Sequence, residues 1–274
     1  MLKDLLHRVR QDSPLVHVIT NYVTVNDCAN ALLAIGASPI MADDKEEVEE
    51  ITALAQALVL NIGTLNTRTV ESMVLAGRRA CKLGLPVILD PVGCGASELR
   101  RKTVRDLLAA VQFCAIRGNL SEIRALYAGN HTSRGVDADA LDVIGAENRD
   151  AIADLACAAA RATGAVIVIS GATDVVASPE GQAAFLSNGV PMMSRVTGTG
   201  CMSSAILGAF LGANPDAPFA AAVAATAAMG VAGEVAHRRL GEMDGNASYR
   251  TYLIDALDLM TEETLLREVR YALR

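Results

Sequence analysis

The chain has 274 residues, 51% of them hydrophobic, and a formal net charge of −7. This acidic balance argues against broad electrostatic binding to nucleic acid or to acidic membranes, although a helix terminus and one arginine suffice to bind a single small anion. Only 3% of the residues are aromatic and tryptophan is absent, so aliphatic side chains must fill the core.

The first half of the chain alternates short apolar runs with helical patterns. We expect strands at 15–19, 38–41, 57–61 and 86–90, and helices at 24–34, 43–56, 67–83 and 99–111. His17, inside an apolar strand, is predicted to be a core histidine with its hydrogen bonds satisfied. Acidic residues crowd the segment 43–47, and a solvated helix start explains them better than a metal site does.

The second half continues the same alternation. We expect strands at 113–117 and 165–170, a hairpin from 175–178 and 183–186, helices at 120–128 and 148–162, and a helical C-terminal part. The apolar run 219–233 is mostly alanine and too short for a membrane span, so it is predicted to be a core helix. The loop 129–135 is too short to separate two domains, and the sequence predicts one domain over 1–274.

Apolar strands alternating with helices are typical of an α/β fold, with a mainly parallel sheet covered by helices on both faces. Ligands bind at the carboxyl ends of the strands in such folds. Six candidate residues follow predicted strands: Asn21, Met41, Asp90, Arg117, Glu122 and Ser170.

Six cysteines are scattered along the chain without a CxxC pair. Free thiols in a reducing compartment are the simplest interpretation. The N-terminus carries an early acid and lacks a long apolar core, which is not the pattern of a signal peptide. The sequence therefore predicts a cytoplasmic location.

The segment 196–201 reads Val-Thr-Gly-Thr-Gly-Cys and precedes a helical pattern. A helix N-terminus attracts phosphate, although a glycine pair by itself often serves only a tight turn. No GxxxxGK[ST] pattern is present, so a P-loop is not expected. Cys201 begins the predicted helix, where the dipole is expected to lower its pKa.

Cys201 allows two chemical interpretations, a general base or a covalent nucleophile. No cysteine–histidine–acid set is evident in the sequence, so we rank the base first. Asp90 can either help hold Mg²⁺ or accept loop amides before Pro91. Asn119 and Glu122 have the spacing of a capping box. Arg117 closes a predicted strand, where its guanidinium is placed to bind a phosphate. Ser170 also has two interpretations: it either belongs to a turn at the end of a strand or contacts a nucleotide phosphate through its hydroxyl.

Taken together, these motifs resemble the hydroxyethylthiazole kinases, a family of the ribokinase-like superfamily that serves thiamine salvage. The matching segments are 18–30, 36–41, 61–65, 90–93, 117–119 with Glu122, 135–137 and 196–201. The resemblance implies a three-layer ribokinase-like fold, with helices on both faces of a mainly parallel sheet. It also implies a kinase that uses ATP and Mg²⁺ to phosphorylate the alcohol of 4-methyl-5-(2-hydroxyethyl)thiazole.

The resemblance also assigns residues. It implies substrate contacts for Met41, Gly198, Asn21 and Val23, ATP or phosphate contacts for Arg117, Ser170, Thr199 and Gly200, metal-associated roles for Asp90 and Glu122, and catalysis by Cys201. Members of the family are typically homotrimers with sites at the subunit interfaces, so we expect a homotrimer here. The alternatives are a pyrimidine kinase, a dehydratase for hydrated nicotinamide nucleotides, or a non-catalytic regulator that binds a nucleotide or a thiazole.

Overall fold

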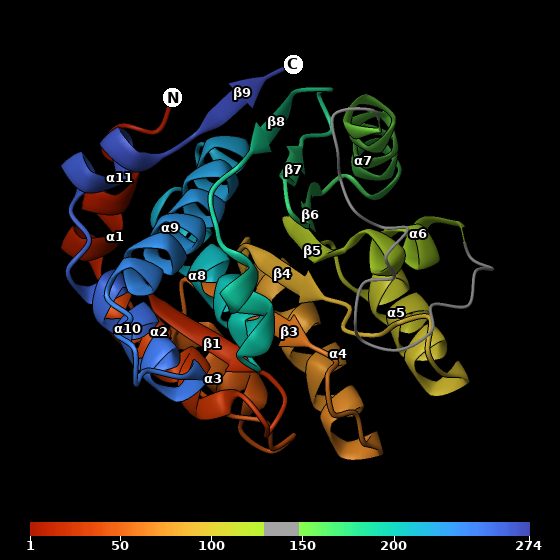
Figure 1. Cartoon of the computed structure of the whole chain (residues 1–274). Helices are drawn as coiled ribbons and strands as arrows, with labels where there is room; N and C mark the ends of the chain where they lie inside the picture. Colours follow the sequence, from red (N-terminus) through yellow and green to blue (C-terminus); the bar gives the residue numbers. More distant parts are fainter. Residues whose placement is uncertain (129–147) are drawn as a thin grey trace.

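The computed structural model describes residues 1–128 and 148–274, and a nine-stranded sheet runs through these residues (Figure 1). Its strands are β1 (Leu15–Ile19), β2 (Ser38–Ile40), β3 (Ala57–Asn61), β4 (Val87–Asp90), β5 (Ala115–Asn119), β6 (Val166–Ser170), β7 (Asp174–Ala177), β8 (Ala183–Leu186) and β9 (Tyr271–Leu273). They lie in the order β2-β1-β3-β4-β5-β6-β7-β8-β9. Strands β1 to β6 pair in parallel and β6 to β9 pair antiparallel, which confirms the mainly parallel sheet.

Helices cover both faces of this sheet. They are α1 (Leu5–Asp12), α2 (Val25–Ile35), α3 (Val48–Leu54), α4 (Thr67–Leu83), α5 (Glu98–Ala110), α6 (Leu120–Ala128), α7 (Arg149–Thr163), α8 (Thr199–Ala213), α9 (Pro218–Arg238), α10 (Asn246–Asp258) and α11 (Glu262–Glu268), with a 3-10 helix, η2 (Pro191–Arg195). One core cluster joins α1, α2 and α8–α11 to one face, and a second joins α3–α7 to the other. The pleat explains this division, because successive strand residues such as Val59 and Leu60 enter different clusters.

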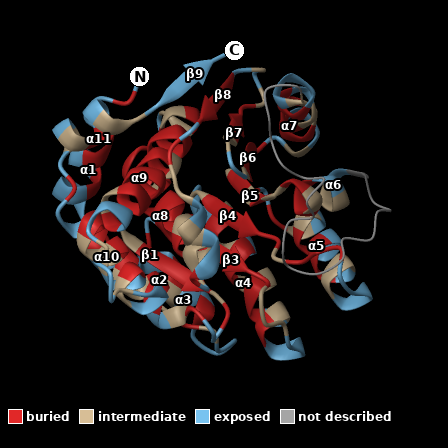
Figure 2. Cartoon of the chain, in the orientation of Figure 1, coloured by how far each residue is buried: buried red, intermediate tan, exposed pale blue. Residues whose placement is uncertain are grey.

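Helices α8 and α9 lie deepest among the helices and carry almost no polar face (Figure 2). Helix α9 is long and apolar enough to cross a membrane, but 83% of its most apolar window is buried inside the protein. A helix that is apolar all round is expected in a core, and the predicted core helix at 219–233 is confirmed.

The structure corrects two of the predicted elements and adds a third. Helix α3 begins at Val48 rather than at residue 43, because the carboxylate of Asp44 accepts the amide of Glu46 in a preceding turn. Strand β5 lies two residues later than predicted, in register with β6, so Arg117 lies within the strand and Asn119 ends it. Strand β9 was not predicted, and its three residues are exposed (Figure 2).

Two smaller predictions are confirmed. His17 is fully buried, and its ring nitrogens lie 3.0 Å from Thr52 Oγ1 and 2.8 Å from the carbonyl oxygen of Ala42. All six cysteines are free thiols. The predicted loop at 129–135 and the motif at 135–137 lie outside the described residues.

Candidate active site

Six parallel strand ends line one edge of the sheet. In sheet order from β2 to β6, the residues at these ends are Met41, Asn21, Asn61, Asp90, Asn119 and Ser170. The carboxyl edge therefore gathers most of the residues that the sequence singles out, as expected for this class of fold. The N-terminus of α8 meets the middle of this edge, because Ser204 and Cys201 contact residues at the ends of β3 and β4.

Cys201 lies in a network of buried amides. The side-chain amide of Asn21 donates to Cys201 Sγ (3.1 Å) and to Asn61 Oδ1 (3.1 Å), and the amide of Asn61 donates to Cys201 Sγ (3.3 Å). Thr24 Oγ1 donates to Asn21 Oδ1 (3.0 Å) and so fixes the orientation of that amide. Two N–H donors therefore point at one sulfur, an arrangement that stabilises a thiolate if one forms.

The predicted low pKa of Cys201 is wrong. Burial and the charge of Asp90 raise the pKa of the Cys201 thiol, against hydrogen bonds with Thr24, Asn21 and Asn61. Desolvation of the charged form therefore outweighs the helix terminus. The raised pKa favours the neutral thiol, and the two amide donors already contact its sulfur.

Asp90 is almost fully buried at the end of β4. Its Oδ2 accepts hydrogen bonds from Asn61 Nδ2 (2.7 Å) and Ser204 Oγ (2.7 Å). Burial raises the pKa of this carboxyl although Arg117, Ser204 and Asn61 all oppose the rise. Asp90 is thus held in one orientation, with both of these bonds on one oxygen.

Glu122 occupies the first turn of α6, close to Asp90. Its two oxygens accept the amides of Gly93 and Asn119, each at 2.8 Å, and Asn119 Oδ1 accepts the amide of Glu122 in return (2.8 Å). The predicted capping box is confirmed. Burial and the charge of Asp90 raise the pKa of Glu122 to about 7. Gly118 makes room for this carboxylate, because a Cβ there would lie 2.9 Å from Glu122 Oε2.

The carboxylates of Asp90 and Glu122 suit a divalent cation whose remaining ligands are waters and phosphates. No group of three or more His, Cys, Asp or Glu side chains that could hold a metal occurs within residues 1–128 and 148–274. Burial raises the pKa of both carboxyls, and the charge of Asp90 adds to the rise at Glu122, so a nearby cation is favoured. Mg²⁺ is commonly held by one or two carboxylates with waters and phosphates, and Asp90 with Glu122 matches that pattern.

The start of α8 has unpaired backbone amides at the place where the sequence predicts an anion-binding surface. Gly198 caps the helix with φ +94°, a backbone conformation that favours glycine. The amides of Thr199, Gly200 and Cys201 begin the helix, where backbone N–H groups lack an intrahelical acceptor. Arg117 reaches this turn from β5, because a Cβ on Gly200 would lie 3.4 Å from its Nη1.

The remaining predicted residues, Met41, Val23 and Ser170, lie outside the hydrogen-bond network of Asp90 and Cys201. Met41 and Cys201 are partly buried and pack against the same core cluster. Val23 is 57% exposed, so its side chain lies on the surface. Ser170 ends β6 opposite Asn119, and its hydroxyl makes a long bond to the carbonyl of Gly118 (3.4 Å).

The sequence patterns assign no role to Asn61 or Ser204, which the structure places against Asp90 and Cys201. Asn61 ends β3 and so follows the same strand-end rule that found Asp90. Ser204 follows Cys201 by three positions on a helix, a spacing that places both on one face. Asp174 was also missed. It accepts the amide of Gly171 (2.9 Å), and burial raises its pKa to about 6 although Arg117 opposes the rise.

A cavity of about 660 Å³ lies at the other edge of the sheet. Leu85, Phe113 and Cys114 line it, just before the amino ends of β4 and β5. None of the predicted site residues lines this cavity, and the polar network at the carboxyl edge is the better candidate for chemistry.

Both the sequence and the structure of this chain are similar to those of hydroxyethylthiazole kinases. A sequence model of the hydroxyethylthiazole kinase family matches residues 6–263. Hydroxyethylthiazole kinase from Clostridium acetobutylicum is 53% identical over 271 residues, with 99% of each chain covered. The structure of hydroxyethylthiazole kinase from Pyrococcus horikoshii superposes with a TM-score of 0.88 at 36% identity, covering 100% of this chain and 98% of that one.

A ribokinase-like superfamily protein from Enterococcus faecalis has a TM-score of 0.60 at 12% identity, with 94% of each chain covered, and this likeness concerns the fold alone. The fold is ribokinase-like, as expected. The match to the family model and the identity to the clostridial enzyme extend over nearly the whole chain. This chain belongs to the hydroxyethylthiazole kinase family.

Proposed function

We propose that this chain transfers the terminal phosphoryl group of ATP to the hydroxyl of 4-methyl-5-(2-hydroxyethyl)thiazole, a step of thiamine salvage. The observation that carries the proposal is the meeting of Asp90, Cys201 and the N-terminus of α8 at the carboxyl edge of the sheet. Membership of the hydroxyethylthiazole kinase family supports the substrate.

The phosphate side of the site consists of the first turn of α8 with Arg117 and Ser170. The amides of Thr199, Gly200 and Cys201 and the guanidinium of Arg117 would stabilise negative charge on the transferring group. Asp90 and Glu122 would hold Mg²⁺, which neutralises charge on the phosphates when bound.

Cys201 would take the proton of the acceptor hydroxyl. Its sulfur already accepts two amide hydrogen bonds, so the amides of Asn21 and Asn61 would stabilise the thiolate at the moment of transfer. Because its pKa is raised, only a small fraction is thiolate at neutral pH. The base would then contribute modestly to a reaction that depends mainly on positioning and charge stabilisation.

The acceptor side would be formed by Met41, Gly198, Asn21 and Val23. We infer a homotrimer with the sites at subunit interfaces, supported by the exposed apolar side chains of Tyr22 (79%) and Val23 (57%) beside Asn21. Light scattering should give three chain masses in solution.

A cytoplasmic location fits the six free thiols.

The test is incubation of the protein with ATP, Mg²⁺ and the thiazole alcohol, followed by detection of its phosphate monoester. A panel with an aminopyrimidine alcohol and a hydrated nicotinamide nucleotide distinguishes the rival enzymes. Product from another member of the panel, and none from the thiazole, would overturn the proposal. Binding of ATP without turnover of any compound would favour a regulator.

A further inference from the structure

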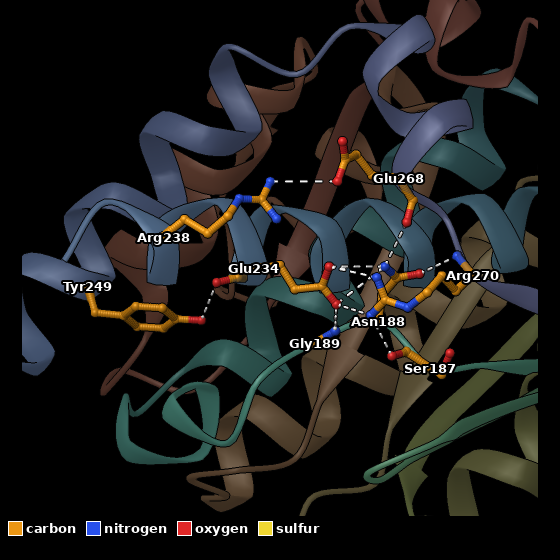
Figure 3. A network of polar contacts seen from close by, with 9 residues as sticks. Ser187, Asn188, Gly189, Glu234, Arg238, Tyr249, Glu268 and Arg270 are labelled. Atoms are coloured by element: carbon orange, nitrogen blue, oxygen red, sulfur yellow. Dashed lines mark hydrogen bonds and ion pairs between the residues drawn. The ribbon is translucent and has the colours of Figure 1, made fainter.

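A second polar network, away from Asp90, surrounds Glu234 near the C-terminal end of α9 (Figure 3). The carboxylate is 8% exposed and accepts hydrogen bonds from the amide of Gly189 (2.7 Å) and from Arg270 Nη2 (2.5 Å) and Nη1 (3.1 Å). Asn188 Nδ2 lies 3.3 Å from both of its oxygens. One buried charge thus joins α9, the segment after β8 and the segment before β9.

The C-terminal segment is attached to the chain after β8 by backbone bonds as well. The amide of Ser187 donates to the carbonyl of Arg270 (3.0 Å), and Arg270 Nη2 donates to the carbonyl of Ser187 (2.9 Å). Asn188 accepts the amide of Arg270 (2.7 Å) and donates to the carbonyl of Glu268 (3.0 Å). The backbone bond between Ser187 and Arg270 continues the antiparallel pairing of β8 with β9, and the side-chain bonds reinforce it.

Residues 187–198, which we call the acceptor loop, run from this network to the candidate active site. Gly189 has φ +118° and turns the chain along α9. The loop packs directly on the helix there, since a Cβ on Gly230 would lie 2.7 Å from Asn188 Cβ and one on Gly233 would lie 2.6 Å from Met193 Sδ. The start of the loop therefore has little freedom to move relative to α9.

The far end of the acceptor loop is tied to the start of α8. The carbonyl of Met193 accepts the amide of Val196 (3.3 Å) and Thr199 Oγ1 (3.1 Å). Asn246, at the start of α10, donates to the carbonyl of Arg195 (3.4 Å). Thr199 is two residues from Cys201, so the position of the loop bears directly on the first turn of α8.

We propose that Glu234, held by Arg270, is a positioning residue for the acceptor side of the site. Its charge fixes Gly189 and thereby the acceptor loop, which carries Gly198 to the place where the alcohol would bind. Loss of the charge shifts Gly198 relative to Cys201 while Asp90 and Arg117, on other elements, stay in place. This inference rests on the proposed function.

Glu234→Gln tests the inference, because it keeps the shape of the side chain and removes the charge that holds Arg270. We expect the KM for the thiazole alcohol to rise about tenfold, with the KM for ATP within about twofold of wild type. Arg270→Gln should give the same split, and Arg270→Lys, which keeps a cation, should restore most of the affinity. A purely structural role would lower the active fraction and leave both KM values unchanged.

Arg238→Gln is the matched control. Arg238 lies one turn after Glu234 in α9, is 57% exposed and pairs with Glu268 at 3.7 Å, so it contacts the C-terminal segment but not the acceptor loop (Figure 3). Its kinetics should match wild type. If all three Gln variants behave alike, or if the KM for ATP rises with that for the alcohol, the inference is overturned.

Hydrogen exchange distinguishes this inference from the proposed function. In Glu234→Gln the amides of 189–201 should exchange about tenfold faster than in wild type, and in Arg238→Gln they should not. Wild-type protein that fails to phosphorylate the thiazole would refute the proposed function, and exchange would still decide the role of Glu234. Unchanged exchange in Glu234→Gln would refute the positioning role, whatever the activity.

Discussion

Asp90 and Glu122 at the carboxyl edge of the sheet, and Glu234 in α9, are buried carboxylates in opposite electrostatic situations. Burial raises the pKa of Asp90 and of Glu122, and the charge of Asp90 adds to the rise at Glu122. Burial would also raise the pKa of Glu234, but hydrogen bonds from Arg270, Gly189 and Asn188 and the charge of Arg270 lower it overall. Arg117 opposes the rise at Asp90 without reversing it.

The two networks therefore differ in what balances their buried charge. The chain supplies the counter-ion of Glu234, and the resulting network holds three segments together. At Asp90 and Glu122, by contrast, the chain supplies too little positive charge to balance the two carboxylates. This imbalance lowers the stability of the fold and favours the binding of a cation. Variants of Asp90, Cys201 and Glu122 test this contrast.

The largest effect is expected at Asp90. Asp90→Asn keeps the hydrogen bonds to Asn61 and Ser204 within reach but removes the charge, so turnover should fall about 10³-fold. The melting temperature should stay level or rise, because an undercompensated buried charge is lost. Steady-state kinetics and thermal unfolding check the two results. A less stable variant with near-normal turnover would contradict the contrast and assign Asp90 a structural role.

A smaller effect is expected at Cys201. Cys201→Ala should lower kcat about 10²-fold, the contribution of a general base, and leave the KM for the thiazole alcohol nearly unchanged. Because the pKa of Cys201 is raised, wild-type kcat/KM should climb with pH by up to about tenfold per unit through neutrality.

The Cys201 prediction has its control in Cys201→Ser, which keeps a small polar group but lacks a thiolate. In this variant the climb of kcat/KM with pH should disappear. If the climb persists, another group takes the proton and Cys201 only positions the alcohol.

The smallest effect is on stability in the absence of metal. The pKa of Glu122 is about 7 in the folded protein against an ordinary value of 4.5, so the folded state binds the extra proton. Stability should therefore fall as pH rises from about 4.5 to about 7. Glu234, whose pKa is lowered, contributes in the opposite sense, and its share is lost as pH falls through its folded pKa. Denaturant titrations of Glu122→Gln should show a flatter fall between about pH 4.5 and about 7, whereas the same slope as wild type would contradict the assignment.

Local patterns were enough to predict most of the elements. The helix at 67–83 matches α4 at both ends, where Asn66 caps the start and Gly84 the end. The hairpin of β7 and β8 and the capping box of Asn119 and Glu122 are equally local. The errors arise where tertiary contacts decide, because the register of β5 is set by β6, and β9 forms only through pairing with β8.

The sequence by itself determined the α/β class and the strand-end positions of Asp90 and Asn21, because apolar periodicity and chain order are written in it. It also determined the family, through motifs spread along the chain. Only the tertiary structure decided the state of Cys201. The helix start in the sequence favoured a thiolate, but the folded protein buries the sulfur beside Asp90. Desolvation and the charge of a neighbour depend on which residues the fold brings together, and no local pattern contains them.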